Sequence, residues 1–491
     1  MQLSPEGADA RAPISAEEAV RNRLVIGLLL ISAFVVILNE TIMGVALPHL
    51  MDDLSITAGL AQWLTTAFLL TMAVVIPITG FLLQRLNTRP VFIVAMSSFA
   101  LGTLVCALAP GFPMLVAGRV IQAIGTAIMM PLLMTTVMNL VPPETRGRTM
   151  GNISIVISVA PAIGPTISGI ILNYLDWRWM FWLVLPIALG ALLLGHLRIV
   201  NVTTPRYAPL DIPSVLLSVL GFGGLVYGLS AIGESVAGHS GPPVWMPIAG
   251  GCVVIALFVL RQLQLQKSDT ALLDLRTFTS PIFTVAVLML AVAMMALFGT
   301  IILLPIYMQN VLGLDPLGTG LLLLPGGLAM GIMAPFVGRL FDRFGPTPLL
   351  VPGAIITSGA LWSMTLLDQN SAVGWLLAMH IALSVGLALM FTPLFTSGLA
   401  SLPARLYSHG SAMVGTLQQV AGAAGIALFV SLLTIETTRL AGAGADPVTA
   451  IAGGIHVAFL CGAFISLLLV AAAFFVRRPK AEPVAVPAPG H

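Results

Sequence analysis

Long apolar stretches, separated by short polar or Pro/Gly-rich breaks, follow one another along almost the whole chain. Each stretch is about 20 residues or longer, enough to cross a hydrocarbon core of about 30 Å as an α-helix. The apolar residues are continuous and do not alternate with polar ones, which argues against the strands of a membrane barrel. Lipid offers the backbone no hydrogen-bond partners, so the pattern predicts an all-α integral membrane protein.

The breaks divide the chain into 14 predicted spans. They begin near Leu24, Gly59, Pro90, Phe112, Thr149, Trp179, Ile212, Val244, Pro281, Leu317, Pro348, Val373, Ser411 and Ile451. Residues 233–243, between the seventh and eighth spans, are rich in glycine and are compatible with either a hairpin or a longer loop.

Composition agrees with this pattern. Hydrophobic residues make up 58% of the 491 residues, charged residues only 8%, and the mean hydropathy is +1.03. A soluble chain of this length needs far more polar surface to cover its cores. Cys106, Cys252 and Cys461 all lie inside apolar stretches, where we expect small buried side chains rather than disulfides or metal ligands. We therefore expect no metal and no cofactor.

Several function classes are excluded by what the sequence lacks. Its only lysines, Lys267 and Lys480, do not follow a glycine, so the chain has no phosphate-binding loop of an ATP-driven pump. It contains no His-Glu-x-x-His string, and His380 has no recognisable nucleophile partner, so we do not expect an enzyme. No basic patch interleaved with aromatic residues indicates nucleic acid.

The basic residues predict the orientation in the membrane. If the N-terminus is cytoplasmic, 18 of the 21 Lys and Arg residues fall in inner loops and tails, and only Arg178 and Arg439 fall in outer loops. The remaining one, Arg119, lies inside a span. This bias is the one that the positive-inside rule describes. It predicts a multi-pass protein of the cell membrane with an even number of spans and both termini in the cytoplasm.

An internal repeat divides the chain. Pro77, Gly80, Arg85 and Pro90 recur as Pro335, Gly338, Arg343 and Pro348, each 258 residues later. Two halves of six spans need an offset of only about 200 residues, so about 60 extra residues indicate two inserted spans. We expect a cytoplasmic tail (1–23), a six-helix bundle (24–197), two inserted helices (about 212–232 and 244–262 within 198–280), a second six-helix bundle (281–476) and a cytoplasmic tail (477–491).

Two charged side chains lie clearly within spans, Glu40 and Arg119. Counted from the outer ends of their helices, both lie roughly 10–12 Å below the membrane boundary. Charges at this depth are costly and mark functional sites. A pairing of the two is geometrically allowed, and Gln122 can also accept from Arg119, one turn away. A fixed ion pair that braces two helices is the alternative, and His380 is a further titratable group that can equally be a hydrogen-bonded core histidine.

Six motifs in order resemble the major facilitator superfamily, specifically its fourteen-helix drug:proton antiporter branch. They are Leu38-Asn39-Glu40-Thr41-Ile42 with Val45-Ala46-Leu47-Pro48; the loop from Gly80 through Arg85 to Arg89; Arg119, Gln122 and Gly125; Gly164-Pro165 with Ser168-Gly169; Asp176-Trp177-Arg178-Trp179-Met180-Phe181; and Gly338 to Gly345, which includes Asp342 and Arg343. The resemblance runs from about residue 24 to 476. The chain departs from the family pattern at Asn39, where an aspartate is usual, and at Gln84 and Asn87 in the first of the two loops.

The resemblance implies two pseudo-symmetric six-helix bundles plus two inserted helices, and export of small hydrophobic compounds such as drugs in exchange for protons. Glu40, Asn39, Arg119 and Gln122 would then carry proton coupling. The Gly164-Pro165 segment would shape a helix contact on the outer side, and the loop at Asp342 would act as a conformational latch. A dedicated exporter of one lipid, siderophore or secondary metabolite is the alternative, and we expect the protein to function as a monomer.

Polar, aromatic and sulfur-containing residues at membrane depth are the candidates for a substrate cavity between the halves. They are Met43, Gln62, Trp63, Thr66, Phe68, His380, Met413, Gln418 and Gln419.

Overall fold

The computed structural model describes residues 16–56, 58–201, 205, 210–236 and 243–476. Within these residues, 14 helices are long and apolar enough to cross a membrane, and no strand is present. The all-α prediction is confirmed. The predicted C-terminal tail and most of the N-terminal tail lie outside the described residues, but α1 begins at Ala16, eight residues before the expected start of the first span.

The first six long helices are α1 (Ala16–Leu54), α2 (Ala58–Arg85), α3 (Thr88–Ala107), α4 (Phe112–Leu140), α5 (Arg146–Tyr174) and α6 (Trp179–Arg198). The inserted helices are α7 (Ile212–Val236) and α8 (Trp245–Leu265). The last six are α9 (Pro281–Asn310), α10 (Pro316–Phe344), α11 (Thr347–Met364), α12 (Val373–Ala400), α13 (Tyr407–Gly442) and α14 (Pro447–Ala473). Short 3₁₀ turns lie at Pro143–Thr145, Gln266–Ser268, Leu275–Thr279 and Ala404–Leu406.

Local sequence explains where several of these helices begin and end. Ser280, Asp315 and Asp446 each accept a hydrogen bond from a backbone N–H of the first turn, and each is followed directly by a proline. A capping oxygen and a proline at the first helical position are both favourable because first-turn amides have no helical acceptor. Gly345 ends α10 with a φ of 81°, a left-handed conformation that glycine adopts at little cost.

The helices of the two halves pack in the same pattern. In the first bundle α1 contacts α4, α5 and α6, α2 contacts α4, and α3 contacts α4 and α6. The corresponding contacts, from α9 to α12, α13 and α14, from α10 to α12, and from α11 to α12 and α14, form the second bundle. Across the halves, α5 contacts α10 and α12, just as α13 contacts α2 and α4. The repeat in the sequence is therefore a pseudo-twofold symmetry of the helix packing.

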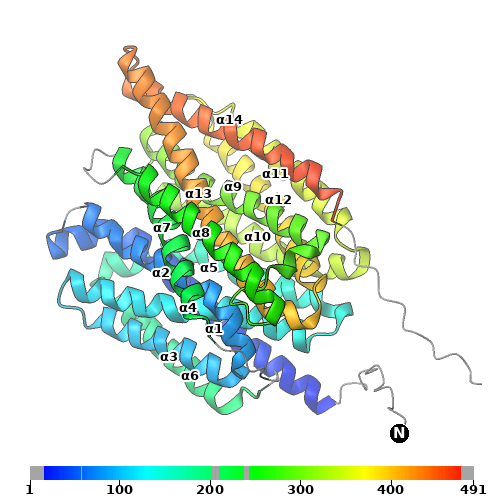
Figure 1. Ribbon diagram of the computed structural model, residues 1–491. Helices are drawn as coiled ribbons and strands as arrows, with labels where there is room; N and C mark the ends of the chain where they lie inside the picture. Colours follow the sequence, from blue (N-terminus) through cyan, green and yellow to red (C-terminus); the bar gives the residue numbers. More distant parts are fainter. Residues whose placement is uncertain (1–15, 57, 202–204, 206–209, 237–242, 477–491) are drawn as a thin grey trace, which may run out of the picture.

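The inserted pair lies against both bundles. Helices α7 and α8 pack on each other, and α7 also contacts α2 and α13 (Figure 1). Asp211 joins the pair by accepting from Arg261 Nε and Nη2 at 2.7 Å each. These bonds, with help from Ser214, hold the pKa of the Asp211 carboxyl down at about 2. The contribution of the depressed carboxyl to stability is present above its usual pKa of 3.8 and is lost only as the pH falls through about 2, so this link stays charged at physiological pH.

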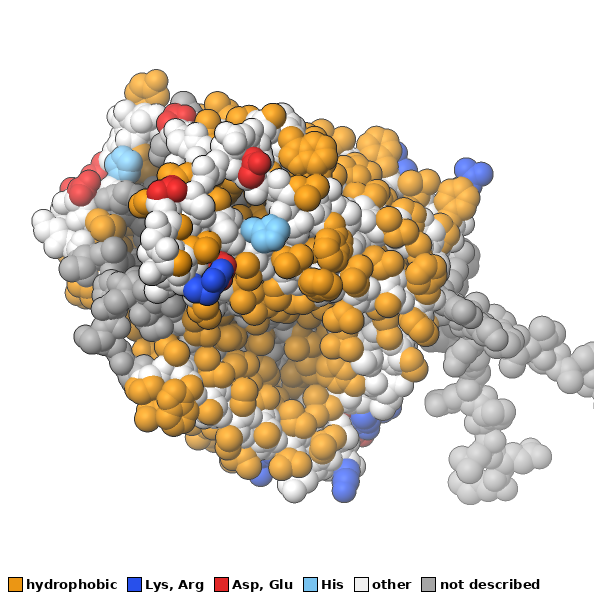
Figure 2. Space-filling model, turned by 90° about the horizontal axis from the view of Figure 1, so that it is seen from above, with side chains coloured by type: hydrophobic (Ala, Val, Ile, Leu, Met, Phe, Trp, Pro, Cys, Tyr) orange, Lys and Arg blue, Asp and Glu red, His pale blue; other side chains and the backbone are white. Residues whose placement is uncertain are grey.

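Charge separates the two ends of the molecule. We call one end the basic end; its described basic residues are Arg21, Arg23, Arg85, Arg89, Arg146, Arg148, Arg198, Arg261, Lys267, Arg276, Arg339, Arg343 and Arg405. We call the other the acidic end; its described carboxylates are Asp52, Asp53, Asp176, Asp315, Asp368, Glu436 and Asp446. Figure 2 shows red carboxylates gathered at one end, most of the visible blue side chains at the other, and orange side chains between them. This distribution is that of a multi-pass membrane protein.

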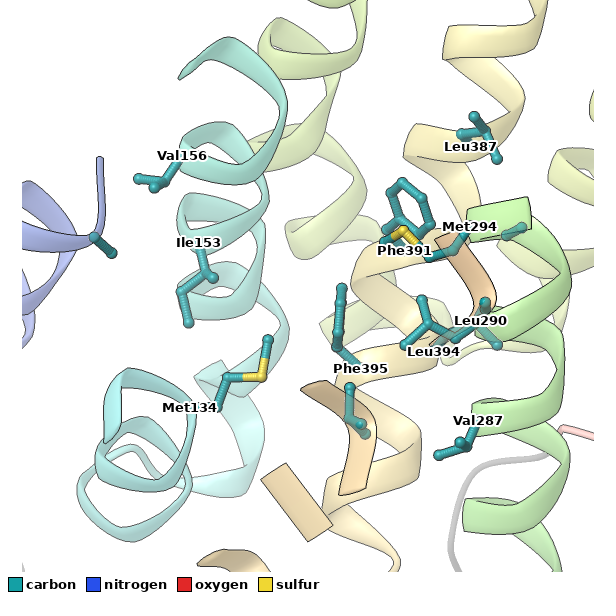
Figure 3. Packing of buried hydrophobic residues seen from close by; sticks show 14 of the residues in the cluster. Met134, Ile153, Val156, Val287, Leu290, Met294, Leu387, Phe391, Leu394 and Phe395 are labelled. Carbon is teal, nitrogen blue, oxygen red and sulfur yellow. The ribbon is translucent and has the colours of Figure 1, made fainter. Parts of the chain in front are cut away.

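The two bundles meet through one buried apolar cluster. Met134 and Ile153 of the first bundle lie on one side, and Phe391 and Phe395 of α12 lie on the other (Figure 3). In the described part of the chain, the hydrogen bonds and close glycine contacts that join the bundles run from the middle of the helices to the basic end. The structure is thus closed at the basic end.

The orientation can be tested with single cysteines. Ala404 and Ala443 are both exposed and lie at the basic and acidic ends. In intact cells whose protein lacks other accessible cysteines, we expect an impermeant maleimide to label Ala443→Cys and to leave Ala404→Cys unlabelled until the cells are opened. Labelling of Ala404→Cys in intact cells would contradict the orientation that the basic residues predict.

Candidate functional site

Close contact between α3 and α4 positions the polar side chains around Arg119 inside the first bundle. A Cβ on Gly102 would overlap the backbone of Gln122, and one on Gly125 would overlap the carbonyl of Ala95. Glycine at these positions lets the two helices approach closely, as small residues do in membrane helix pairs. The approach brings Gln122 within reach of Thr103, to which its Nε2 donates a hydrogen bond at 2.8 Å.

Arg119 is buried with only 1% of its surface exposed. Its Nη1 donates to Asn39 Oδ1 at 3.1 Å and to Gln122 Oε1 at 3.0 Å, and its Nε donates to the carbonyl of Leu64 at 3.5 Å. The guanidinium also lies 4.0 Å from the ring centre of Phe68. Neutral oxygens and an aromatic face therefore surround the charge in place of a carboxylate.

The expected contact between Glu40 and Arg119 is absent, because Asn39 occupies that place. Successive residues on an α-helix point about 100° apart, and here α1 directs Asn39 rather than Glu40 at the guanidinium. Glu40 is half-buried, and no ion pair joins it to Arg119. Asn39 is thus the direct partner of the arginine, and Glu40 lies one residue along the helix. The role of these residues in proton coupling stays a prediction.

The segment expected to be a loop is helical through Phe344, and Asp342 in the last turns of α10 makes the contact expected of a latch. Asp342 accepts hydrogen bonds from the backbone N–H groups of Gly147 and Arg148 at 2.7 and 2.8 Å. These amides belong to the first turn of α5, where a helix has free donors and a partial positive charge. Gly338 permits the approach, because a Cβ there would overlap the backbone of Gly147. Arg343 is exposed, with its guanidinium 5.0 Å from the ring of Phe344.

The equivalent contact in the other half has no charge. Gln84, 258 residues before Asp342, donates from Nε2 to the carbonyl of Arg405 at 3.1 Å. A Cβ on Gly80 would lie 3.2 Å from Ala412 Cβ and 3.3 Å from His409 Nδ1, so α2 and α13 also approach closely. Arg85 is exposed, 5.9 Å from the ring of Phe81.

The Gly164 segment packs within the first bundle. A Cβ on Gly164 would overlap the Thr41 hydroxyl, so this glycine brings α5 against α1 one residue beyond Glu40. Gly169 faces open space, and the side chain of Pro165 lies outside what the structure describes. The expected helix contact is therefore centred on Gly164.

The motif from Asp176 to Phe181, at the acidic end, joins three connections of the first bundle. Trp177 Nε1 donates to Asp53 at 2.8 Å, and Arg178 pairs with Asp176 at 3.2 Å and with Asp53 at 3.7 Å. Arg178 also donates to the carbonyl of Ala109 at 3.1 Å. The segment thereby fastens the α5–α6 connection to the ends of α1 and α3.

The substrate-cavity candidates fall into two groups. Met43, Thr66, Phe68 and Met413 are buried in helix packing, with Phe68 under the guanidinium, so none of them lines an open space in this conformation. Trp63, His380, Gln418 and Gln419 are half-buried, and the side chain of Gln62 lies outside the described residues. Trp63 stacks on Tyr227 of α7 at 6.0 Å, and His380 Nε2 is 3.1 Å from the carbonyl of Leu323. Their assignment to a cavity stays a prediction.

Sequence reasoning missed two residues around these contacts, Thr103 and His409, and it placed Phe68 in the wall of a substrate cavity rather than against the arginine. Thr103 fixes Gln122, Phe68 faces the arginine, and buried His409 accepts from the Asp274 amide at 3.4 Å while it lies against Gly80. A histidine in the first turn of a span was the one visible signal, since a threonine does not stand out in an apolar helix.

Comparison with known proteins agrees with this architecture. The family model "Major Facilitator Superfamily" matches residues 29–426. The MFS-type transporter YcnB of Bacillus subtilis is 41% identical over 95% of this chain and 98% of its own length. The lincomycin resistance protein LmrB of Listeria monocytogenes is 39% identical over 94% of this chain and 98% of its own length. The crystal structure of the human organic anion transporter MFSD10 has a similar fold, with a TM-score of 0.67, 16% identity and coverage of 92% and 99% of the two chains.

The chain belongs to the major facilitator superfamily. Proteins of this family carry small molecules across a membrane and are transporters rather than enzymes. The resemblance seen in the sequence is confirmed.

The charged latch can be tested by Asp342→Asn. The amide keeps one acceptor oxygen but loses the charge at the helix N-terminus, so the closed basic end should lose about 1 kcal/mol, a roughly fivefold shift toward opening. The reporter is the rate at which a small permeant maleimide labels Ala412→Cys, since Ala412 is fully buried between α13 and α2.

Two variants control this test. Asp342→Glu keeps the charge, and Asp53→Asn removes a carboxylate at the opposite end. In both variants the maleimide should label Ala412→Cys at a rate much closer to that of the parent. Equal rates for Asp342→Asn and the parent would show that the charge does not hold the basic end closed.

Proposed function

We propose that this protein exports small hydrophobic or amphiphilic compounds, antibiotics among them, in exchange for protons. LmrB, which aligns with nearly the whole chain, is named for resistance to lincomycin. Residues 24–197 and 281–476 would rock as two bodies about a substrate site between them, in alternating access. The protein would act in the cell membrane as a monomer with both termini in the cytoplasm.

One observation carries the proposal: Glu40 lies inside a span, half-buried and without an ion pair to Arg119. The acceptors of the guanidinium are the neutral oxygens of Asn39, Gln122 and Leu64, so its hydrogen bonds do not depend on the charge of Glu40. The carboxyl can therefore gain and lose a proton without breaking the network around the arginine. A cationic or neutral amphiphile can take the place of the proton at this carboxyl.

His380 offers a second place for a proton. Its Nε2 bonds to the carbonyl of Leu323, while Nδ1 is buried without a hydrogen-bond partner among the described residues. In that arrangement the free Nδ1 can accept a proton. Glu40 remains the preferred carrier because it adjoins the arginine network.

The test is transport into everted membrane vesicles. With an imposed proton gradient, we expect the wild type to accumulate ethidium or lincomycin and Glu40→Gln to lose at least tenfold of this gradient-driven uptake. Glu40→Asp keeps the carboxyl and should retain part of the activity, whereas His380→Gln should retain most of it.

The outcomes separate the parts of the proposal. Equal gradient-driven transport by Glu40→Gln and wild type would remove Glu40 as the carrier, and loss in His380→Gln alone would move the role to His380. Transport that persists when the proton gradient is collapsed would contradict proton coupling itself.

A further inference from the structure

Two hydroxyl pairs join the bundles near the basic end, at positions that the internal repeat makes equivalent. Thr135 of α4 donates to Ser411 Oγ of α13 at 3.2 Å, and Thr392 of α12 lies 2.8 Å from Ser154 Oγ of α5. Thr135 and Thr392 are 257 residues apart in the sequence, and so are Ser154 and Ser411. One pair is therefore the pseudo-twofold image of the other.

The direction of the hydrogen bonds is also the same in both pairs. Ser411 Oγ donates to the carbonyl of Tyr407 at 2.8 Å, and Ser154 Oγ donates to the carbonyl of Met150 at 3.1 Å. Each serine proton is thus used within its own helix, which leaves the serine oxygen as an acceptor for the threonine. In each pair the threonine of one bundle donates to the serine of the other.

All four side chains are buried, with at most 5% of their surface exposed. A buried hydroxyl needs a partner, and here each threonine finds it in the opposite bundle. When the bundles separate at this end, water can replace the partner, so the hydroxyls tolerate both states. Each hydrogen bond contributes only about 1 kcal/mol to the closed state, so the pair opposes opening weakly.

We propose that Thr135–Ser411 and Thr392–Ser154 are paired positioning contacts that set the balance between the closed and open basic end during transport. Because the pairs are related by the pseudo-twofold axis, rocking of the two bundles as rigid bodies breaks both at once. Their contributions to the equilibrium must then multiply. This inference rests on the alternating access of the proposed function. It goes beyond that function by naming the contacts that set the ratio of open to closed.

The test is a distance measurement across the basic end. Glu144 and Ala404 are exposed on the two bundles, and Glu144→Cys with Ala404→Cys places one spin label on each. Cys252 and Cys461 are replaced by serine, and Cys106 is buried and stays unlabelled. Double electron–electron resonance of the full-length protein in lipid nanodiscs, with and without ethidium, then gives the ratio of the long to the short distance.

Thr135→Val and Thr392→Val keep the shape and remove only the donor. Each should raise the ratio of open to closed about fivefold, and the two together about 25-fold. Ser154→Ala should raise the ratio of open to closed more than Thr392→Val does, because it leaves the Thr392 hydroxyl buried without an acceptor. Thr135→Ser restores a hydroxyl donor and should return the ratio toward that of the parent.

A hydroxyl pair within one bundle provides the matched control. Ser466 of α14 donates to Ser358 of α11 at 2.8 Å, and both are buried. Ser466→Ala removes a bond of the same kind without touching the interface between the bundles. It should leave the ratio of open to closed unchanged even where it lowers the melting temperature.

The inference and the proposed function fail in different ways. An open population in the parent that none of Thr135→Val, Thr392→Val and Ser154→Ala changes would overturn the role of the hydroxyl pairs and leave alternating access intact. A double variant with no larger effect than either single variant would show that the pairs do not break together. A single short distance in every variant, with or without ethidium, would instead contradict alternating access.

Discussion

The guanidinium of Arg119 is a permanent charge inside a helix bundle that lipid surrounds, and the first bundle is organised around it. Arginine does not discharge in a protein, so the surrounding groups must supply what water would. Asn39, Gln122 and the Leu64 carbonyl provide three acceptors from three helices, and the ring of Phe68 covers the guanidinium. The glycine contact of α3 with α4 makes this geometry possible, since it lets Thr103 hold Gln122.

The same constraint gives Glu40 its freedom. A carboxylate bonded directly to the arginine would be fixed in the charged form, because breaking such a buried pair is costly. With the amide of Asn39 in the bonding position, the arginine is satisfied whether or not Glu40 carries a proton. The amide at Asn39 and the acid at Glu40 are thus two parts of one arrangement.

The interface between the bundles combines symmetric packing with asymmetric charge. The hydroxyl pairs and the glycine contacts obey the internal repeat, but Asp342 makes a charged contact where the equivalent Gln84 makes a neutral bond. One side of the closed end is therefore held by a carboxylate on a helix N-terminus and the other by amide and hydroxyl bonds. Such an interface can separate without leaving a charge buried on either side.

Sequence reasoning succeeded where a single large free-energy contribution decides the structure. The free energy of burying apolar helices in lipid sets the spans, so Phe112, Trp179, Ile212, Pro281 and Val373 were predicted as helix starts and are observed as such. The first helix was placed too late because its polar start, from Ala16, is continuous with the span. The sequence could not predict which side chain of α1 bonds to Arg119, because a one-residue step along the helix decides between Asn39 and Glu40. The hydroxyl pairs were missed because a serine or threonine in an apolar helix carries no signal until its neighbour is known.

The central claim is that substrate and proton exchange at Glu40, and proton release on substrate binding tests it most directly. Purified protein in weakly buffered detergent solution is mixed with a saturating organic cation such as ethidium, and the pH change is followed with a dye. The account predicts that the wild type releases protons on binding and that Glu40→Gln binds ethidium without releasing them. Equal release by the wild type and Glu40→Gln would contradict it.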